Sequence, residues 1–124
     1  MINNRLNGSL LSQPITIINF VPQFSAKLTT SGTSGSITFP TTTGTQRQTF
    51  CITNKGNNGA YLGWGHTTAT AVATSGTPAA NCHYIATGAI LTLDLQLSTS
   101  IVDTIAAIQD TASTVLEISI GYGQ

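Results

Sequence analysis

Residues 53–65 read TNKGNNGAYLGWG, and this stretch decides how the rest of the chain is interpreted. Its first half is rich in Asn and Gly, which tolerate positive φ and predict a tight turn. Apolar residues alternate with polar or small ones on both sides of that turn and share one face of each strand: Phe50, Ile52, Ala60, Leu62 and Trp64. The pattern predicts a hairpin packed into the core, with Trp64 as a core residue and not a ligand-binding one.

The same two-residue alternation recurs along the chain. It is clearest in four runs, at residues 24–30, 46–53, 88–97 and 114–120. Residues 14–21 are a further predicted strand, which Pro22 is expected to end. About eight short strands separated by turn signals predict an all-β fold, an antiparallel β-sandwich or jelly-roll-like barrel. Residues 14–124 are expected to form this single domain, with residues 1–13 as an N-terminal arm.

Two segments depart from strand alternation. Residues 67–80 are small and polar, and they are predicted to form a long loop that adds little to the core. Near residues 101–109, the sequence Ser100-x-x-Asp103 has the form of a capping box. It is followed by isoleucines at helical spacing, at positions 101, 105 and 108. We therefore expect one short helix near residues 101–109.

The amino-acid composition argues against nucleic acids and membranes as partners. Only 6% of residues are charged, against about 25% in ordinary domains, and the formal net charge is zero. The four basic residues are scattered, whereas nucleic-acid binding needs several cations in one patch. No apolar run is long enough for a signal peptide or a membrane span, so synthesis in a cytoplasm without membrane attachment is expected. A neutral surface of Ser and Thr permits close self-association, and a homo-oligomer, a trimer or dimer, is expected.

The few carboxylates offer one candidate for hydrolysis. Asp94 and Glu117 lie on the outward faces of two predicted strands and would need to meet as a pair for glycosidase chemistry. The alternative is that they keep exposed faces soluble. We favour that alternative, because nothing nearby in the sequence indicates tuning of their pKa values.

Sulfur and imidazole groups offer a candidate metal site: Cys51, His66, Cys82 and His83. The adjacency of the last two and the wide remaining gaps do not match the paired spacing of zinc ligands. A Cys–His nucleophile pair is also weighed, but no orienting acid lies near it in sequence. Two cysteines do not make a disulfide framework, and free thiols are expected in a reducing compartment. No catalytic, metal or cofactor site is predicted.

Aromatic residues offer a candidate binding surface. Tyr61, Tyr84 and Tyr122, with Trp64, would suit a sugar-stacking platform or an interface anchor. Gly63 and Gly65 flank the tryptophan, and such glycines in a strand indicate close backbone approach or a bulge rather than a phosphate loop. Trp64 is assigned to the core, whereas Tyr61 and Tyr122 stay open as interface residues.

From Ile52 to its C-terminal end, the chain resembles small structural proteins of tailed bacteriophages. The similarity covers roughly the last 70 residues and rests on the order of five features. They are an Asn-x-Gly turn (53–56), a strand ending in aromatic-Gly (60–65), a Thr/Ala-rich loop leading to a Gly-opened strand (88–95), the segment Ile-Ala-Ala-Ile (105–108) and a strand finishing Gly-x-Gly (118–123).

The resemblance implies a β-sandwich or jelly-roll module of a virion, without catalytic residues. We expect a non-enzymatic capsid decoration (cement) protein that binds the major capsid protein or another virion protein and is located in the virion. The alternatives are a fibre- or tail-associated β-module and a carbohydrate-binding module that recognises surface glycans. The arm lies outside the resemblance, and an arm-mediated contact is a separate expectation. The expected interface residues are Ile2, Arg5, Leu6, Leu10, Leu11, Tyr61 and Tyr122.

Overall fold

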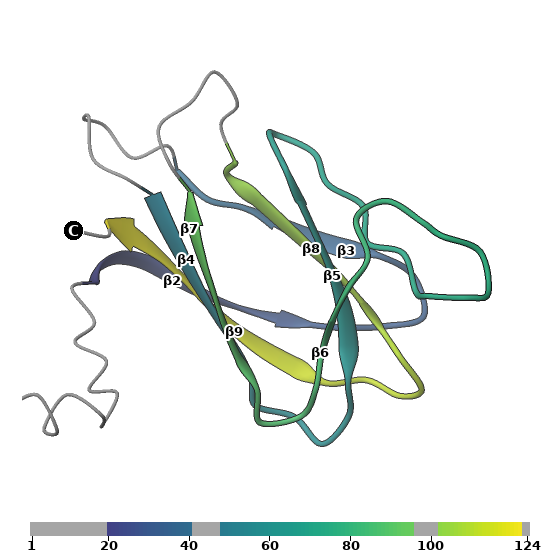
Figure 1. Cartoon of the computed structure of the whole chain (residues 1–124). Coiled ribbons are helices and arrows are strands. Elements are labelled where there is room, and N and C mark those ends of the chain that lie inside the picture. The colour runs from purple at the N-terminus through teal and green to yellow at the C-terminus, as the bar shows by residue number, and fades with distance from the viewer. Residues whose placement is uncertain (1–19, 41–47, 96–101, 123–124) are drawn as a thin grey trace, which may run out of the picture.

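A computed structural model describes residues 20–40, 48–95 and 102–122 (Figure 1). These residues form eight strands in two antiparallel sheets that pack face to face. Sheet I has the order β2 (Val21–Thr29), β9 (Val115–Tyr122), β4 (Gln48–Asn54) and β7 (Ile90–Leu95). Sheet II has the order β3 (Gly35–Thr38), β8 (Thr104–Gln109), β5 (Ala60–Gly65) and β6 (His83–Ile85). The prediction of an all-β sandwich is confirmed, and the described residues contain no helix that could span a membrane.

Strand pairing in the two sheets is nested. β2 pairs with β9, β3 with β8, β4 with β7 and β5 with β6, all antiparallel. The first described strand therefore pairs with the last, the second with the second-last, and so on inward. Successive pairs alternate between sheet I and sheet II. Two further pairings, β4 with β9 and β5 with β8, join the pairs into sheets. This is the strand arrangement of a jelly roll.

The core lies between the sheets and follows the alternation seen in the sequence. Its large, fully buried apolar side chains come from both sheets: Phe50, Ile52, Leu62, Ile105, Leu116, Ile118 and Ile120. The rings of Phe39 and Phe50 meet edge to face with centroids 5.7 Å apart, which is a favourable geometry for aromatic pairs. Trp64 packs against this cluster and stays partly exposed. It therefore lies at the border of the core and not among its fully buried residues.

The predicted hairpin at residues 53–65 is wrong. β4 lies in sheet I and β5 in sheet II, so residues 55–59 carry the chain from one sheet to the other. Gly56 sits at this corner against β9, because a Cβ there would lie 2.8 Å from the amide nitrogen of Val115. Asn and Gly suit a crossing between sheets as well as a hairpin turn, since both require compact backbone conformations.

Asn54, a residue that is only 1% exposed, fixes this corner with its side-chain amide. Its Nδ2 donates to the carbonyl oxygens of Asn58 (2.8 Å) and Ile85 (3.2 Å). Its Oδ1 accepts from the Gly56 amide (3.1 Å) and from the Thr114 hydroxyl (2.7 Å). All four bonds available to a side-chain amide are made, and they join β4 to the β6 end and to the start of β9.

The predicted short helix near residues 101–109 is also wrong, because Thr104–Gln109 form strand β8. β8 is a central strand that pairs with both β3 and β5. Ile105 and Ala107 belong to the core, and Ala106 between them is fully buried as well. With both faces of the strand covered, the two-residue alternation disappears from the sequence. The isoleucine spacing then resembles that of a helix.

Pro22 does not end a strand as expected. β2 begins at Val21 and continues through Pro22 to Thr29, with a shift of register between Pro22 and Phe24. Proline is tolerated in edge strands and at bulges, and both conditions hold here. The rest of the predicted strand at residues 14–21 and the predicted arm at residues 1–13 lie outside the described residues.

Residues 66–82 connect β5 to β6 as a loop without strands, as predicted (Figure 1). This segment, the β5–β6 loop, lies against the outer face of sheet II. A Cβ at Gly63 would come within 2.8 Å of the Thr70 carbonyl oxygen, so glycine permits the loop backbone to approach the strand closely. Ala71 in the loop is only 2% exposed. The loop therefore covers part of a sheet face that would otherwise meet solvent.

Candidate functional site

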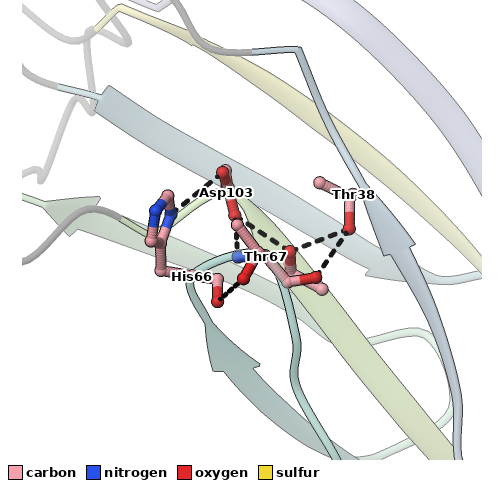
Figure 2. A network of polar contacts seen from close by, with 5 residues as sticks. Thr38, His66, Thr67 and Asp103 are labelled. Atoms are coloured by element: carbon pink, nitrogen blue, oxygen red, sulfur yellow. Dashed lines mark hydrogen bonds and ion pairs between the residues drawn. The ribbon is translucent and has the colours of Figure 1, made fainter.

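Polar contacts gather where the β5–β6 loop begins (Figure 2). The labelled side chains come from the end of β3, the start of the loop and the residue before β8: Thr38, His66, Thr67 and Asp103. The Asp103 backbone is held on two sides. Its amide donates to the Gly65 carbonyl oxygen (3.0 Å), and its carbonyl oxygen accepts from the Phe39 amide (2.8 Å). These two backbone hydrogen bonds to sheet II and its flanking residue fix the position from which the Asp103 carboxylate extends.

The Asp103 carboxylate is buried, with only 5% of its side chain exposed. Its Oδ1 accepts hydrogen bonds from the Thr67 amide (2.8 Å) and the Thr104 hydroxyl (2.9 Å). Its Oδ2 lies 3.1 Å from Nδ1 of His66, whose side chain is half exposed. Burial alone raises the pKa of Asp103, but these hydrogen bonds and the His66 charge lower it, and the net pKa lies below the ordinary 3.8.

This network holds the first turn of the loop in an uncommon conformation. Thr67 has a φ of 58°, which is unfavourable for a β-branched residue and needs support from its surroundings. Asp103 supplies that support at the Thr67 amide. The Thr38 hydroxyl bonds to the Thr104 hydroxyl (2.9 Å) and to the Thr67 carbonyl oxygen (3.4 Å).

The His66–Asp103 pair resembles the imidazole–carboxylate pairs of acid–base catalysts only in part. In a catalytic triad, the histidine also bonds to a nucleophilic hydroxyl. Here the hydroxyls of Thr38, Thr67 and Thr104 bond to Asp103, to backbone carbonyl oxygens or to each other. The geometry of these residues is that of a clamp that fastens the loop to sheet II.

Tyr61 and Tyr84 form an aromatic pair on the outer face of sheet II. They lie directly opposite each other in β5 and β6, with ring centroids 5.2 Å apart. Tyr84 is 47% exposed and Tyr61 is partly buried. A Cβ at Gly59 would come within 2.6 Å of the Tyr84 ring carbons, so this glycine leaves room for the ring. The pair offers an exposed aromatic surface to a ligand or a partner.

For the expected interface residues other than Tyr61, the structure does not describe the side-chain positions. Five of them lie outside the described residues: Ile2, Arg5, Leu6, Leu10 and Leu11. The backbone of Tyr122 pairs with Val21 and Gln48 at the end of β9, whereas its side chain is outside the described part. The interface assignment of all seven residues stays a prediction.

The backbone positions of the two residues considered for hydrolysis lie far apart. Asp94 is opposite Thr49 and Glu117 is opposite Thr53, four residues further along the central strand β4. This offset, with two strand spacings between β7 and β9, separates their Cα atoms by about 16 Å. The carboxyl groups of glycosidases lie roughly 5–9.5 Å apart. The backbone geometry does not favour a catalytic pair.

The candidate zinc ligands are spread over both sheets. Cys51 is on β4 of sheet I, His66 follows β5, and Cys82 and His83 lie at the start of β6. Within the described ranges, no three or more His, Cys, Asp or Glu side chains gather in a metal-binding group. Both cysteines are free thiols, as expected. His83 lies beside Trp64, with ring centroids 6.2 Å apart.

Two features of these sites were not identified from the sequence. Asp103 was expected to cap a helix, and it caps the turn at Thr67 instead. No local signal connects them, because they lie 36 residues apart. Tyr84 was one of several aromatics without an assigned position. Its pairing with Tyr61 depends on the return of the chain through β6, which alternation alone does not predict.

Comparisons with known proteins do not assign this chain to a family. No family model matches the sequence, and no curated protein matches it. A similar solved structure is a chain from work described as "Bacillus endospore appendages form a novel family of disulfide-linked pili". It has 16% sequence identity and a TM-score of 0.48, and the match covers 87% of this chain and 91% of that chain.

Proposed function

We propose that this protein is a non-enzymatic structural protein of a phage virion, located on the capsid as a decoration protein. The resemblance in residues 52–124 suggests the virion, and the structural observation that carries the proposal is the outer face of sheet I. Its described side chains are mostly small or hydroxyl-bearing, and they include Ser25, Cys51, Thr53, Thr92 and Ser119. A face of this kind suits contact with another protein surface, because interface centres are depleted in charge.

The described charges on this face are paired, with one glutamate between two lysines and a sum of +1. Glu117 lies 3.9 Å from Nζ of Lys27 and 3.2 Å from Nζ of Lys55. These pairs are partly exposed and contribute little to stability. They do leave the described part of the face without a strong field of one sign. A partner surface that is itself neutral can then cover it without long-range repulsion.

Binding of this kind stabilises a shell by mass action. A decorating protein that binds only the assembled lattice lowers the free energy of the assembled state by an amount set by its concentration and affinity. The capsid surface is the proposed partner, and the chain itself supplies a preformed sandwich. The proposal includes residues 1–13 as an arm that reaches a neighbouring capsid subunit.

The test of this proposal is the copy number of the chain in purified virions, and the arm provides a matched variant. A chain that lacks residues 1–13 is expected to occupy fewer sites than the full chain, because it loses the contacts of the arm. Mass spectrometry of virions, with the major capsid protein as internal reference, measures the occupancy. Equal thermal unfolding of the two isolated chains is the control. Unchanged occupancy would remove the arm from the proposal.

A second candidate function is glycan recognition by a fibre- or tail-associated module. The exposed Tyr61–Tyr84 pair favours it. If the protein recognises glycans, Tyr84→Ala is expected to lower glycan affinity about tenfold. The substitution removes an exposed ring that contributes roughly 1 kcal/mol or more to the binding free energy. Glycan-array binding followed by calorimetry measures the change. Phe24→Ala is the control, since Phe24 is a 40% exposed aromatic on sheet I. Absence of any glycan binding by the unmodified chain eliminates this candidate.

A further inference from the structure

Among the described strands of the sandwich four lie at sheet edges, and three of them are protected against further pairing. β2 carries Pro22, a shift of register and the exposed Lys27, which are all devices that block edge association. β3 has only four residues, and the β5–β6 loop lies beside it, with the Ala71 amide donating to the Ser34 hydroxyl (2.8 Å). β6 has only three residues. Short strands offer few backbone groups to a partner.

β7 differs from these three edges. Its six residues read ILTLDL, without proline, lysine or glycine, and its register with β4 is continuous. Ile90 at its start is 67% exposed, more than any other large apolar side chain in the described structure. β7 is also the end strand of sheet I. Asp94 is the one charged residue of this strand. An exposed edge strand that is otherwise free of such devices is a template for another strand.

The phase of the β4–β7 ladder shows which backbone groups point outward. The Asn54 amide donates to the Ala89 carbonyl oxygen (3.0 Å), which places positions 54 and 89 at a hydrogen-bonded step. Such steps alternate along an antiparallel pair. Residues 91, 93 and 95 therefore bond to β4, while residues 90, 92 and 94 turn their N–H and C=O groups to the open edge. Nothing in the described part of the chain pairs with that edge.

The side chains of β7 are arranged symmetrically about Thr92. Leu91 and Leu93 stand on either side of it, turn toward the core and remain only partly buried. Thr92 is exposed on the outer face of sheet I. If a second β7 runs antiparallel with Thr92 opposite Thr92, each Leu91 meets Leu93 of the second copy. Side chains at the rim of each core then cover one another.

We propose that β7 pairs with β7 of a second copy about a two-fold axis at Thr92, joining two copies of sheet I into one continuous sheet. The outward residues then form three hydrogen-bonded pairs, 90 with 94, 92 with 92 and 94 with 90. Each pair exchanges two backbone bonds. The contact also covers Leu91 and Leu93, and zero net charge on each copy gives little repulsion. The inference rests on the edge geometry and not on the capsid proposal.

Charge substitutions at the two-fold axis test this register. Thr92→Lys places two lysines directly opposite each other, and Thr92→Glu does the same with two glutamates. Each variant is expected to raise the dimer dissociation constant about five- to tenfold, because like charges opposite each other destabilise strand pairs. An equimolar mixture of the two variants is expected to recover dimer, since Lys then faces Glu. Sedimentation equilibrium over a range of concentrations measures all three samples.

Thr29→Lys is the matched control, because Thr29 is an exposed threonine on the opposite edge strand of the same sheet. It is expected to dimerise like the unmodified chain. Thermal unfolding of each variant confirms the fold. The proposal is overturned if the unmodified chain stays monomeric at about 1 mM, if either Thr92 variant associates like the unmodified chain, or if the mixture does not recover dimer.

Discussion

Replacing Asn54 by alanine is expected to destabilise the protein by about 3–5 kcal/mol. The side chain is fully buried and joins β4, the β6 end and the start of β9 through four hydrogen bonds. Alanine removes all four, and it leaves buried groups such as the Thr114 hydroxyl without this acceptor. Such a loss is a large share of the 5–15 kcal/mol typical of a domain. Urea unfolding is expected to show a lower midpoint at unchanged slope.

Asn58→Ala is the control for this prediction. Asn58 lies in the same corner, but its side chain makes one exposed hydrogen bond, to the Ser113 carbonyl oxygen (3.1 Å). Its loss is expected to cost less than about 1 kcal/mol. Equal losses for the two variants would show that the corner is held by its backbone and not by the buried Asn54 amide.

The second large effect is expected at Asp103. Asp103→Ala removes the acceptor of the Thr67 amide and of the Thr104 hydroxyl, and it leaves Thr67 in its positive-φ conformation without a partner for its amide. We expect a loss of about 2–4 kcal/mol at neutral pH. The measurement is urea unfolding of the variant and the unmodified chain. Asp110→Ala is the control, because Asp110 is an exposed carboxylate in the turn after β8.

The effect of Asp103 should depend on pH in one direction. Its pKa is lowered in the folded protein relative to 3.8, so the folded state favours the ionised carboxylate. That contribution is fully present above pH 3.8 and is lost as the pH falls through the lower folded pKa. The difference in stability between Asp103→Ala and the unmodified chain should therefore shrink below pH 3.8. A constant difference down to the acid transition would show that ionisation of Asp103 does not contribute.

Much of the core could be predicted from alternation, because one face of sheet I is buried and the other is not. In β9, Leu116, Ile118 and Ile120 are fully buried, while Glu117 and Ser119 between them are partly exposed. β8 gave no such signal. Its outer face is covered as well, so Ala106 is as buried as Ile105, and the spacing of its isoleucines resembles that of a helix.

The corner at residues 55–59 could not be predicted for a different reason. An Asn- and Gly-rich turn serves both a hairpin and a crossing between sheets, and the choice depends on pairings with distant strands. β4 finds its partners in β7 and β9, and β5 finds its partners in β6 and β8. The local sequence of residues 53–65 does not specify the partners of either strand. The same limit applies to the Asp103 clamp and to the Tyr61–Tyr84 pair.

The most direct test of the proposed function is the number of copies of this chain in purified virions, measured by mass spectrometry against the major capsid protein. A decoration protein is expected in numbers comparable to those of the major capsid protein, and washing that leaves the shell intact should not remove it. Absence of the chain from the particle, or its presence in only a few copies, would contradict the assignment to the capsid surface.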